Sequence, residues 1–163
     1  VTYNGFLMDF RTSKDLPEHD GYLLKDNTTL GERNVSYLKK TIELCRENGV
    51  QLMLMKVPSY SDNWSLDYDR QIEEIASQYD ISYVNFDAYS DEIGLDYHKH
   101  SPDEGSHLNT PGAELFTGYL GEYISKKYEV PSHAEEESYK KIWDVKMKRY
   151  EDDKKAGMEE IID

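Results

Sequence analysis

The order of apolar patterns along the 163 residues predicts an α/β protein with a parallel sheet. Segments with helical spacing alternate with two short, mostly apolar runs, 51–58 and 81–87, which have the length of buried strands. Such alternation produces right-handed crossovers, which place successive strands parallel. We therefore expect a flavodoxin-like, three-layer sheet. Two strands are few for it, so we expect a partial domain, with further strands encoded before Val1 or supplied by another chain.

The first half of the alternation is a helix, a strand, a helix and a strand. Asn34 is a candidate N-cap for the first helix, and Gly49 is a candidate left-handed terminator. The strand 51–58 is closed by its proline, and the strand 81–87 is rich in β-branched and aromatic residues. Apolar residues recur every three or four positions in the two helices: Val35, Leu38, Ile42 and Cys45, then Tyr68, Ile72, Ile75, Ala76 and Tyr79.

The second half consists of a loop and two helices. Residues 88–109 are polar and carry three of the five histidines, so they are expected to form a loop. A helix is predicted after it, with Thr110 as the cap and Pro111 at its first position. The tail after Ser132 has the pattern of an amphipathic helix that packs on the domain or on a partner. The apolar stripe of that tail is Tyr139, Ile142, Trp143, Met147 and Tyr150.

These patterns divide the chain into three parts. Residues 1–33 have no sustained period and are expected to be an irregular lead-in or a lid, in which 5–10 resembles a short strand. Residues 34–130 hold the α/β alternation, and residues 131–163 form the helical tail.

Charge and composition exclude several classes of partner. Lys and Arg number 19 and Asp and Glu number 33, which gives a net charge of −14. Nucleic acids and anionic membrane faces attract basic surfaces, so we expect neither as a partner. We expect no transmembrane segment, because no run approaches the roughly 18 apolar residues of a membrane helix. The single cysteine, Cys45, forms no internal disulfide.

The stretch DEGSHLNTPGAELF (103–116) has the composition of a general-base site. His107 follows two acids, Asp103 and Glu104, and comes just before a predicted helix. An imidazole titrates near neutral pH, and a carboxylate that accepts its Nδ1 proton fixes the tautomer with a free Nε2. The stretch also follows the carboxyl end of a strand, where open α/β sheets collect ligands. A loop histidine that only packs locally is the alternative.

This stretch resembles the last conserved block of the SGNH (GDSL-type) hydrolases, in which an Asp-x-x-His pair precedes the final helix. The likeness extends over roughly residues 34–128, and HLN followed by GA and an aromatic is similar to bacterial cell-envelope members. It implies ester hydrolysis or acyl transfer on an acylated carbohydrate or envelope polymer, without a cofactor, in an extracytoplasmic or cell-envelope location.

The resemblance also implies roles for single residues. His107 matches the catalytic base. Glu104 has the family's spacing to it and Asp103 the family's residue type; we favour Asp103, because a loop absorbs a shift of one position easily. Asn109 is expected to cap or brace the loop rather than to act in the chemistry, and it is a candidate substrate contact.

The sequence departs from the family at the nucleophile. No Gly-Asp-Ser block occurs, and nothing matches the family's oxyanion donors. The loop serines Ser59, Ser61 and Ser106 lie in no glycine-flanked elbow. We therefore expect the nucleophile to lie outside this chain, in a missing N-terminal half of the domain, and the chain alone to be inactive.

Two other functions remain open. A metal site is one, because nitrogen and oxygen ligands gather at His98, His100, His107, Asp96, Asp103 and Glu104. The other is a non-catalytic binding or interaction module, in which Trp64 and Tyr60 form a platform for a saccharide. As a partner we expect a second copy of the chain, in a homo-oligomer, or the missing N-terminal half of the domain.

Overall fold

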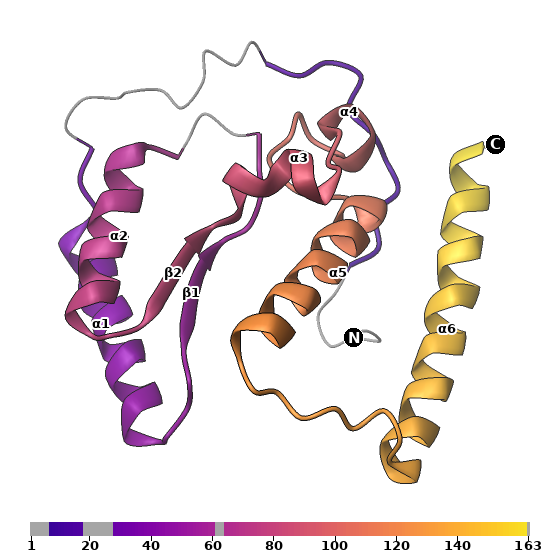
Figure 1. The fold of residues 1–163 in the computed structure, drawn as a ribbon. Coiled ribbons are helices and arrows are strands. Elements are labelled where there is room, and N and C mark those ends of the chain that lie inside the picture. The colour runs from indigo at the N-terminus through magenta and orange to yellow at the C-terminus, as the bar shows by residue number, and fades with distance from the viewer. Residues whose placement is uncertain (1–6, 18–27, 61–63, 163) are drawn as a thin grey trace. The chain divides into compact units, whose positions relative to one another are not determined.

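A computed structural model describes residues 7–17, 28–60 and 64–162, and it confirms the mixed α/β class. The described residues are mostly helical and contain a two-stranded parallel sheet (Figure 1). The elements in chain order are α1 (Glu32–Glu47), β1 (Met53–Lys56), α2 (Leu66–Gln78), β2 (Ser82–Asn85), η1 (Phe86–Tyr89), α3 (Ser90–Ile93), α4 (Tyr97–His100), α5 (Thr110–Lys127) and α6 (Glu137–Ile162).

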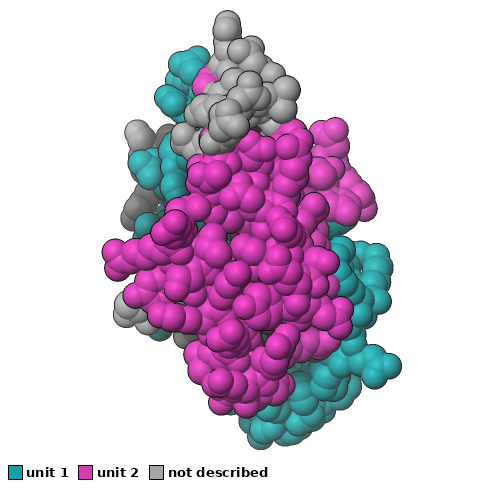
Figure 2. Space-filling view, turned by 90° about the vertical axis from the view of Figure 1, so that its left-hand side faces the viewer, with its two compact units in different colours: residues 1–16, 93–163 teal, residues 17–92 magenta. Residues whose placement is uncertain are grey.

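The chain divides into two compact units, shown in different colours in Figure 2. One unit is continuous and spans residues 17–92. The other combines residues 1–16 with residues 93–163, so its two parts come from opposite ends of the chain.

In the unit of residues 17–92, the predicted helices and parallel strands are confirmed. β1 and β2 pair in parallel, with Met53 opposite Ser82, and α2 connects them. Helices α1 and α2 lie on the same side of this small sheet (Figure 1). The strands are shorter than predicted. β2 ends at Asn85 because its side chain accepts a hydrogen bond from the Asp87 backbone N–H and starts the 3-10 turn η1.

The buried apolar core of this unit is small and comes from both helices and from η1. Ile42 of α1, Ile75 and Ala76 of α2 and Phe86 are buried. The predicted cap at Asn34 is wrong: α1 begins at Glu32, after Gly31, with no side-chain cap.

The segment that leads into α1 is instead positioned by α2. The Gln71 side chain of α2 accepts a hydrogen bond from the Leu30 N–H and donates one to the Thr28 carbonyl. Gly49 has a φ of +65°, which confirms the predicted left-handed end of α1.

Residues 88–109 are more ordered than a loop. They contain the end of η1 and the short helices α3 and α4. η1 and all of α3 except Ile93 belong to the unit of residues 17–92, and α4 belongs to the other unit. The predicted cap of α5 is wrong by one residue: Asn109, not Thr110, accepts from the Gly112 N–H, and Pro111 is the second helical residue. Residues 7–10 are not a strand, and residues 5 and 6 of that predicted strand lie outside the described residues.

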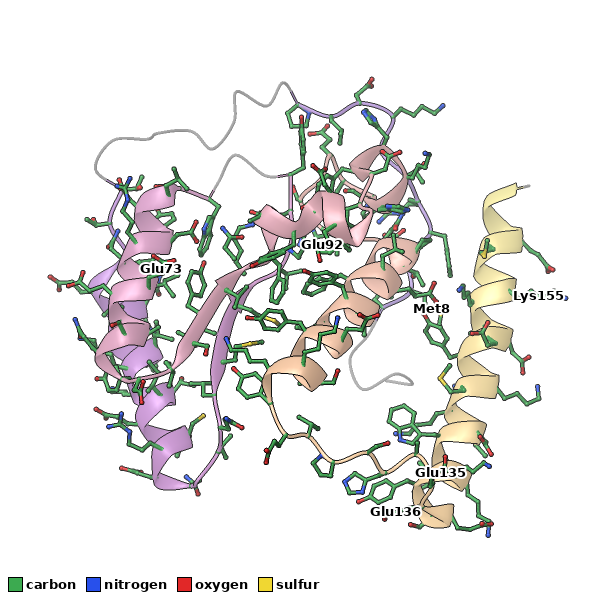
Figure 3. The ribbon with its side chains drawn as sticks, in the orientation of Figure 1. Met8, Glu73, Glu92, Glu135, Glu136 and Lys155 are labelled. Carbon is green, nitrogen blue, oxygen red and sulfur yellow. The ribbon has the colours of Figure 1, made fainter. Side chains whose placement is uncertain are left out.

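The predicted C-terminal helix is confirmed as α6, but its stripe is only partly covered. Near its C-terminal half, Tyr150 and Lys154 bond to Glu114 of α5, and Phe10 lies against Gly157. The stripe of the N-terminal half is exposed: Tyr139, Ile142, Trp143 and Met147 keep 45–57 % of their surface. Glu135 and Glu136 lie beside the start of α6, and Lys155 lies near its C-terminal end (Figure 3). No described helix is long and apolar enough to cross a membrane.

Candidate functional site

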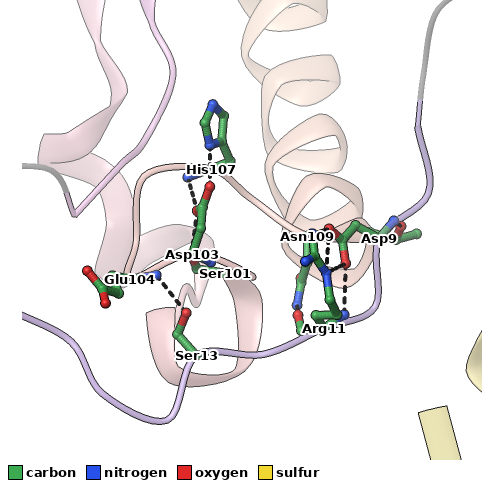
Figure 4. Close-up of polar contacts among 9 residues, drawn as sticks. Asp9, Arg11, Ser13, Ser101, Asp103, Glu104, His107 and Asn109 are labelled. Atoms are coloured by element: carbon green, nitrogen blue, oxygen red, sulfur yellow. Dashed lines mark hydrogen bonds and ion pairs between the residues drawn. The ribbon is translucent and has the colours of Figure 1, made fainter.

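The loop that joins α4 to α5 brings His107 onto Asp103. The carboxylate meets the histidine twice: Oδ1 accepts from the His107 backbone N–H at 2.8 Å, and Oδ2 lies 2.5 Å from the ring Nδ1 (Figure 4). A backbone hydrogen bond from the Ser106 N–H to the Asp103 carbonyl closes the turn between them. The loop therefore fixes both the position and the tautomer of the imidazole.

The electrostatics of the pair favour an ionised carboxylate. Burial alone raises the pKa of Asp103, but the hydrogen bonds from the ring and the backbone of His107 outweigh it, so this pKa is lowered. The His107 side chain is 79 % exposed. Among the described residues, its Nε2 atom has no hydrogen-bond partner, so it is open to a hydroxyl that needs a base.

Glu104 has a different place in the loop. It adopts a left-handed φ of +56°, its backbone N–H donates to Ser13 Oγ, and its side chain points away from His107 (Figure 4). Within the described part of the chain, its carboxylate forms no hydrogen bond. The structure therefore brings Asp103, and not Glu104, to the histidine.

Asn109 is almost completely buried and holds the loop together. Its Oδ1 caps α5, and its Nδ2 donates to the carbonyls of Arg11 at 2.9 Å and Lys99 at 2.8 Å. Both amide hydrogens are thus used within the protein. The expected bracing role is confirmed, and direct contact with substrate stays a prediction.

An N-terminal segment, residues 9–13, runs along this loop, and we call it the strap. Asp9 and Thr110 exchange two hydrogen bonds, of 2.7 and 2.9 Å, and the Ser13 N–H donates to the Ser101 carbonyl at 2.8 Å. Asp9 also forms an ion pair with Arg11. The strap was not predicted from the sequence, because residues 11–13 are polar turn formers with no period.

The histidines predicted as metal ligands make separate contacts. The His100 Nδ1 accepts from the Asp96 N–H, and the His98 Nδ1 lies 3.2 Å from the Lys14 carbonyl. No three His, Cys, Asp or Glu side chains converge on one point in the residues that the structure describes. The alternative of a metal site therefore has no assembled ligand set there.

The unit of residues 17–92 holds a second polar cluster, at the carboxyl ends of its strands. Lys56 and Asp87 form an ion pair with side chains only 8 % and 9 % exposed. Lys56 also donates to Ser59 Oγ and to the Val57 carbonyl, and Asp87 accepts from the Ser59 N–H at 2.7 Å. This pair was not predicted from the sequence, although a lysine inside an apolar strand is a signal for it.

Trp64 lies beside this cluster and is half-buried. Its Nε1 donates to Asp69, its ring meets Tyr68 edge-on at 5.5 Å, and Lys56 lies over it at 5.7 Å. A saccharide platform at Trp64 stays a prediction. Of the loop serines, Ser61 lies outside the described residues, and Ser59 and Ser106 have no bond to His107.

Comparisons with protein-family models, curated proteins and solved structures find no match.

Proposed function

We propose that this chain supplies the base and its acidic partner to an SGNH-type esterase or acyltransferase site. The observation that carries the proposal is the His107–Asp103 pair, with Nδ1 at 2.5 Å from the carboxylate and an Nε2 atom directed to solvent. This is the arrangement by which Ser-His-Asp enzymes orient their imidazole. The resemblance of residues 34–128 to that family gives the reaction class.

The proposed reaction has two steps, and His107 moves one proton in each. In the first step, which forms the acyl-serine, its Nε2 accepts the proton of a serine hydroxyl while the serine oxygen attacks an ester carbonyl. The imidazolium then gives this proton to the leaving alkoxide, and the ester bond breaks. In the second step His107 takes the proton of water or of an acceptor hydroxyl, whose oxygen attacks the acyl-serine, and returns that proton to the serine oxygen as the acyl–serine bond breaks. Asp103 stays ionised and stabilises the imidazolium, which agrees with its lowered pKa.

The serine is proposed to come from sequence outside residues 1–163, within a larger flavodoxin-like, three-layer sheet. An acylated carbohydrate or envelope polymer is the proposed substrate, and an extracytoplasmic or cell-envelope location is proposed with it. Both follow from the family resemblance.

Labelling with a fluorophosphonate tests the proposal. The whole gene product is treated with the probe, and adducts are located by mass spectrometry. We expect one serine adduct that disappears in His107→Ala and forms more slowly in Asp103→Asn. Glu104→Gln is the matched control, because it removes a neighbouring acid without touching the His107 contacts.

Two results would contradict the proposal. One is the absence of an adduct in the wild-type gene product. The other is an adduct whose rate of formation is the same in wild type and His107→Ala.

An interaction module is the second candidate function. The exposed stripe of Tyr139, Ile142, Trp143 and Met147 on α6 favours it, since exposed apolar patches mark interaction sites. A wild-type gene product without a serine adduct would favour this candidate.

A further inference from the structure

Two buried serine hydroxyls lie under the loop that carries His107. Ser101 is completely buried and Ser13 is 8 % exposed. Ser13 reaches the loop from the strap, 91 positions away in sequence, and its Oγ accepts from the Glu104 N–H at 2.6 Å. Ser101 Oγ accepts from the Gly105 N–H at 2.8 Å. The two hydroxyl oxygens therefore accept hydrogen bonds from two consecutive backbone N–H groups of the same turn.

This turn has an unusual backbone. Glu104 has a φ of +56° and Gly105 a φ of +89°, so two successive residues are left-handed. The conformation suits glycine but is unfavourable for glutamate, and it persists where neighbouring groups hold it. Ser13 supplies such a group, because its hydroxyl holds the amide of the residue that carries the strain.

The turn also determines where the carboxylate of Asp103 lies. It connects Asp103 to His107, whose ring and backbone N–H both bond to that carboxylate. Ser101 Oγ also contacts Asp103: it lies 3.3 Å from the Asp103 backbone N and 3.4 Å from Asp103 Oδ1. A change in the left-handed turn would therefore move the carboxylate relative to the imidazole.

We propose that Ser13 is a positioning residue of the His107–Asp103 pair: its hydroxyl holds the Glu104 backbone in the left-handed turn that presents Asp103 to the ring. Its effect on acyl transfer rests on the proposed function, but its effect on the pair does not. Ser13 is not a substitute nucleophile, because it is buried and its oxygen is occupied by the Glu104 N–H.

The test measures the pair directly, without an activity assay. The Asp103 carboxyl carbon is titrated by NMR in wild type and in Ser13→Ala, and hydrogen exchange of the Glu104 amide is followed in both. We expect the pKa of Asp103 to move up toward its ordinary value in the variant, because the His107 hydrogen bonds that lower it lose their geometry. We expect the Glu104 amide to exchange about fivefold faster or more.

Ser106→Ala is the matched control, because Ser106 is an exposed serine of the same loop, and both readouts should keep their wild-type values. If Ser13→Ala does not fold, Ser13→Thr and Ser13→Val replace it, since they share a shape and differ in the hydroxyl. The threonine should keep the wild-type titration and the valine should not.

An Asp103 titration that is unchanged in Ser13→Ala, or equal in the threonine and valine variants, overturns the inference. This result is distinguishable from failure of the proposed function. If the titration shifts and the wild-type gene product still forms no fluorophosphonate adduct, Ser13 positions the pair and the hydrolase proposal is wrong.

Discussion

The backbone carbonyl of His100 passes so close to Gly112 that a Cβ atom at position 112 would lie 2.6 Å from its oxygen. The same carbonyl accepts a hydrogen bond from the Asn109 N–H at 3.0 Å. The start of α5 and the end of α4 are therefore in direct contact, and this contact fixes one end of the loop that carries the His107–Asp103 pair. Only glycine fits at position 112 without displacing backbone atoms.

We expect Gly112→Ala to lower the free energy of unfolding by about 1–3 kcal/mol, because the added methyl group overpacks a backbone contact. Alanine is the better helix former by up to about 1 kcal/mol, which acts in the opposite direction. Gly118→Ala in the same helix is the control. A Cβ atom added at position 118 would have no neighbour within 4 Å, so this variant should have a higher free energy of unfolding than wild type. Urea unfolding compares them, and equal stability of the two variants would contradict the expectation.

Removing Lys56 should cost far more stability than removing an exposed lysine. Lys56→Met leaves the Asp87 carboxylate buried and without its cation, so we expect a loss of about 3–5 kcal/mol. Adding Asp87→Asn should restore part of it, because the amide is neutral and its oxygen still accepts from the Ser59 N–H. Lys126→Met breaks an exposed pair with Glu122 and should cost at most about 1 kcal/mol. A Lys56→Met protein as stable as Lys126→Met would show that the pair is not buried in solution.

The stabilisation from the Asp103 carboxylate should depend on pH. Because its pKa is lowered in the folded protein, this contribution is present above the ordinary value of about 4 and is lost as the pH falls through the folded-state value. We expect the free energy of unfolding of wild type to exceed that of Asp103→Asn by less than about 1 kcal/mol near neutral pH, since the side chains of His107 and Asp103 are exposed.

This difference in stability between wild type and Asp103→Asn should shrink as the pH falls from about 5 to about 2. Urea unfolding at a series of pH values measures it, with Glu104→Gln as the matched loss of a negative charge. An advantage that persists unchanged at low pH would contradict the assignment to the carboxylate.

Tyr150 should titrate well above an ordinary tyrosine. Burial and the hydrogen bond that it donates to Glu114 raise its pKa to about 12. The stabilisation linked to this shift is present below the ordinary value of about 10 and is lost as the pH rises through 12.

In Glu114→Gln the pKa should fall but stay above 10, because burial, the larger cause, remains. NMR titration of the ring carbon, assigned with Tyr150→Phe, measures both values. A wild-type titration near 10 would show that α6 does not pack on α5 in solution.

Local patterns predicted most of the secondary structure. Helix, strand, helix and strand follow in the expected order from α1 to β2, because periodicity and β-branched runs report local backbone preferences. Asn109 and Thr110 are both good cap residues, so sequence alone does not choose between them. Tertiary contacts favour Asn109 as the cap, since its side-chain amide donates hydrogen bonds to the carbonyls of Arg11 and Lys99.

The candidate site was predictable in part for the same reason. Asp103 and His107 are four positions apart, so their pairing is visible in the sequence. Ser13 is not, because it reaches Glu104 across 91 positions and no local pattern marks it. The Lys56–Asp87 pair also joins two separate segments, and only the charge inside an apolar strand indicates it.

The strap has a consequence for how the chain folds during synthesis. Its bonds to the loop and to the start of α5 span 88 to 101 positions, so they close late compared with the turns of a helix. A ribosome that adds 5–20 residues per second needs roughly 5–20 s to make the intervening chain. During that time residues 9–13 have been synthesised but the loop residues and Thr110, to which they bond in the folded protein, have not. Asp9, Arg11, Thr12 and Ser13 are polar, so most of the waiting segment is compatible with water, and the His107–Asp103 geometry is completed only when the two distant segments meet.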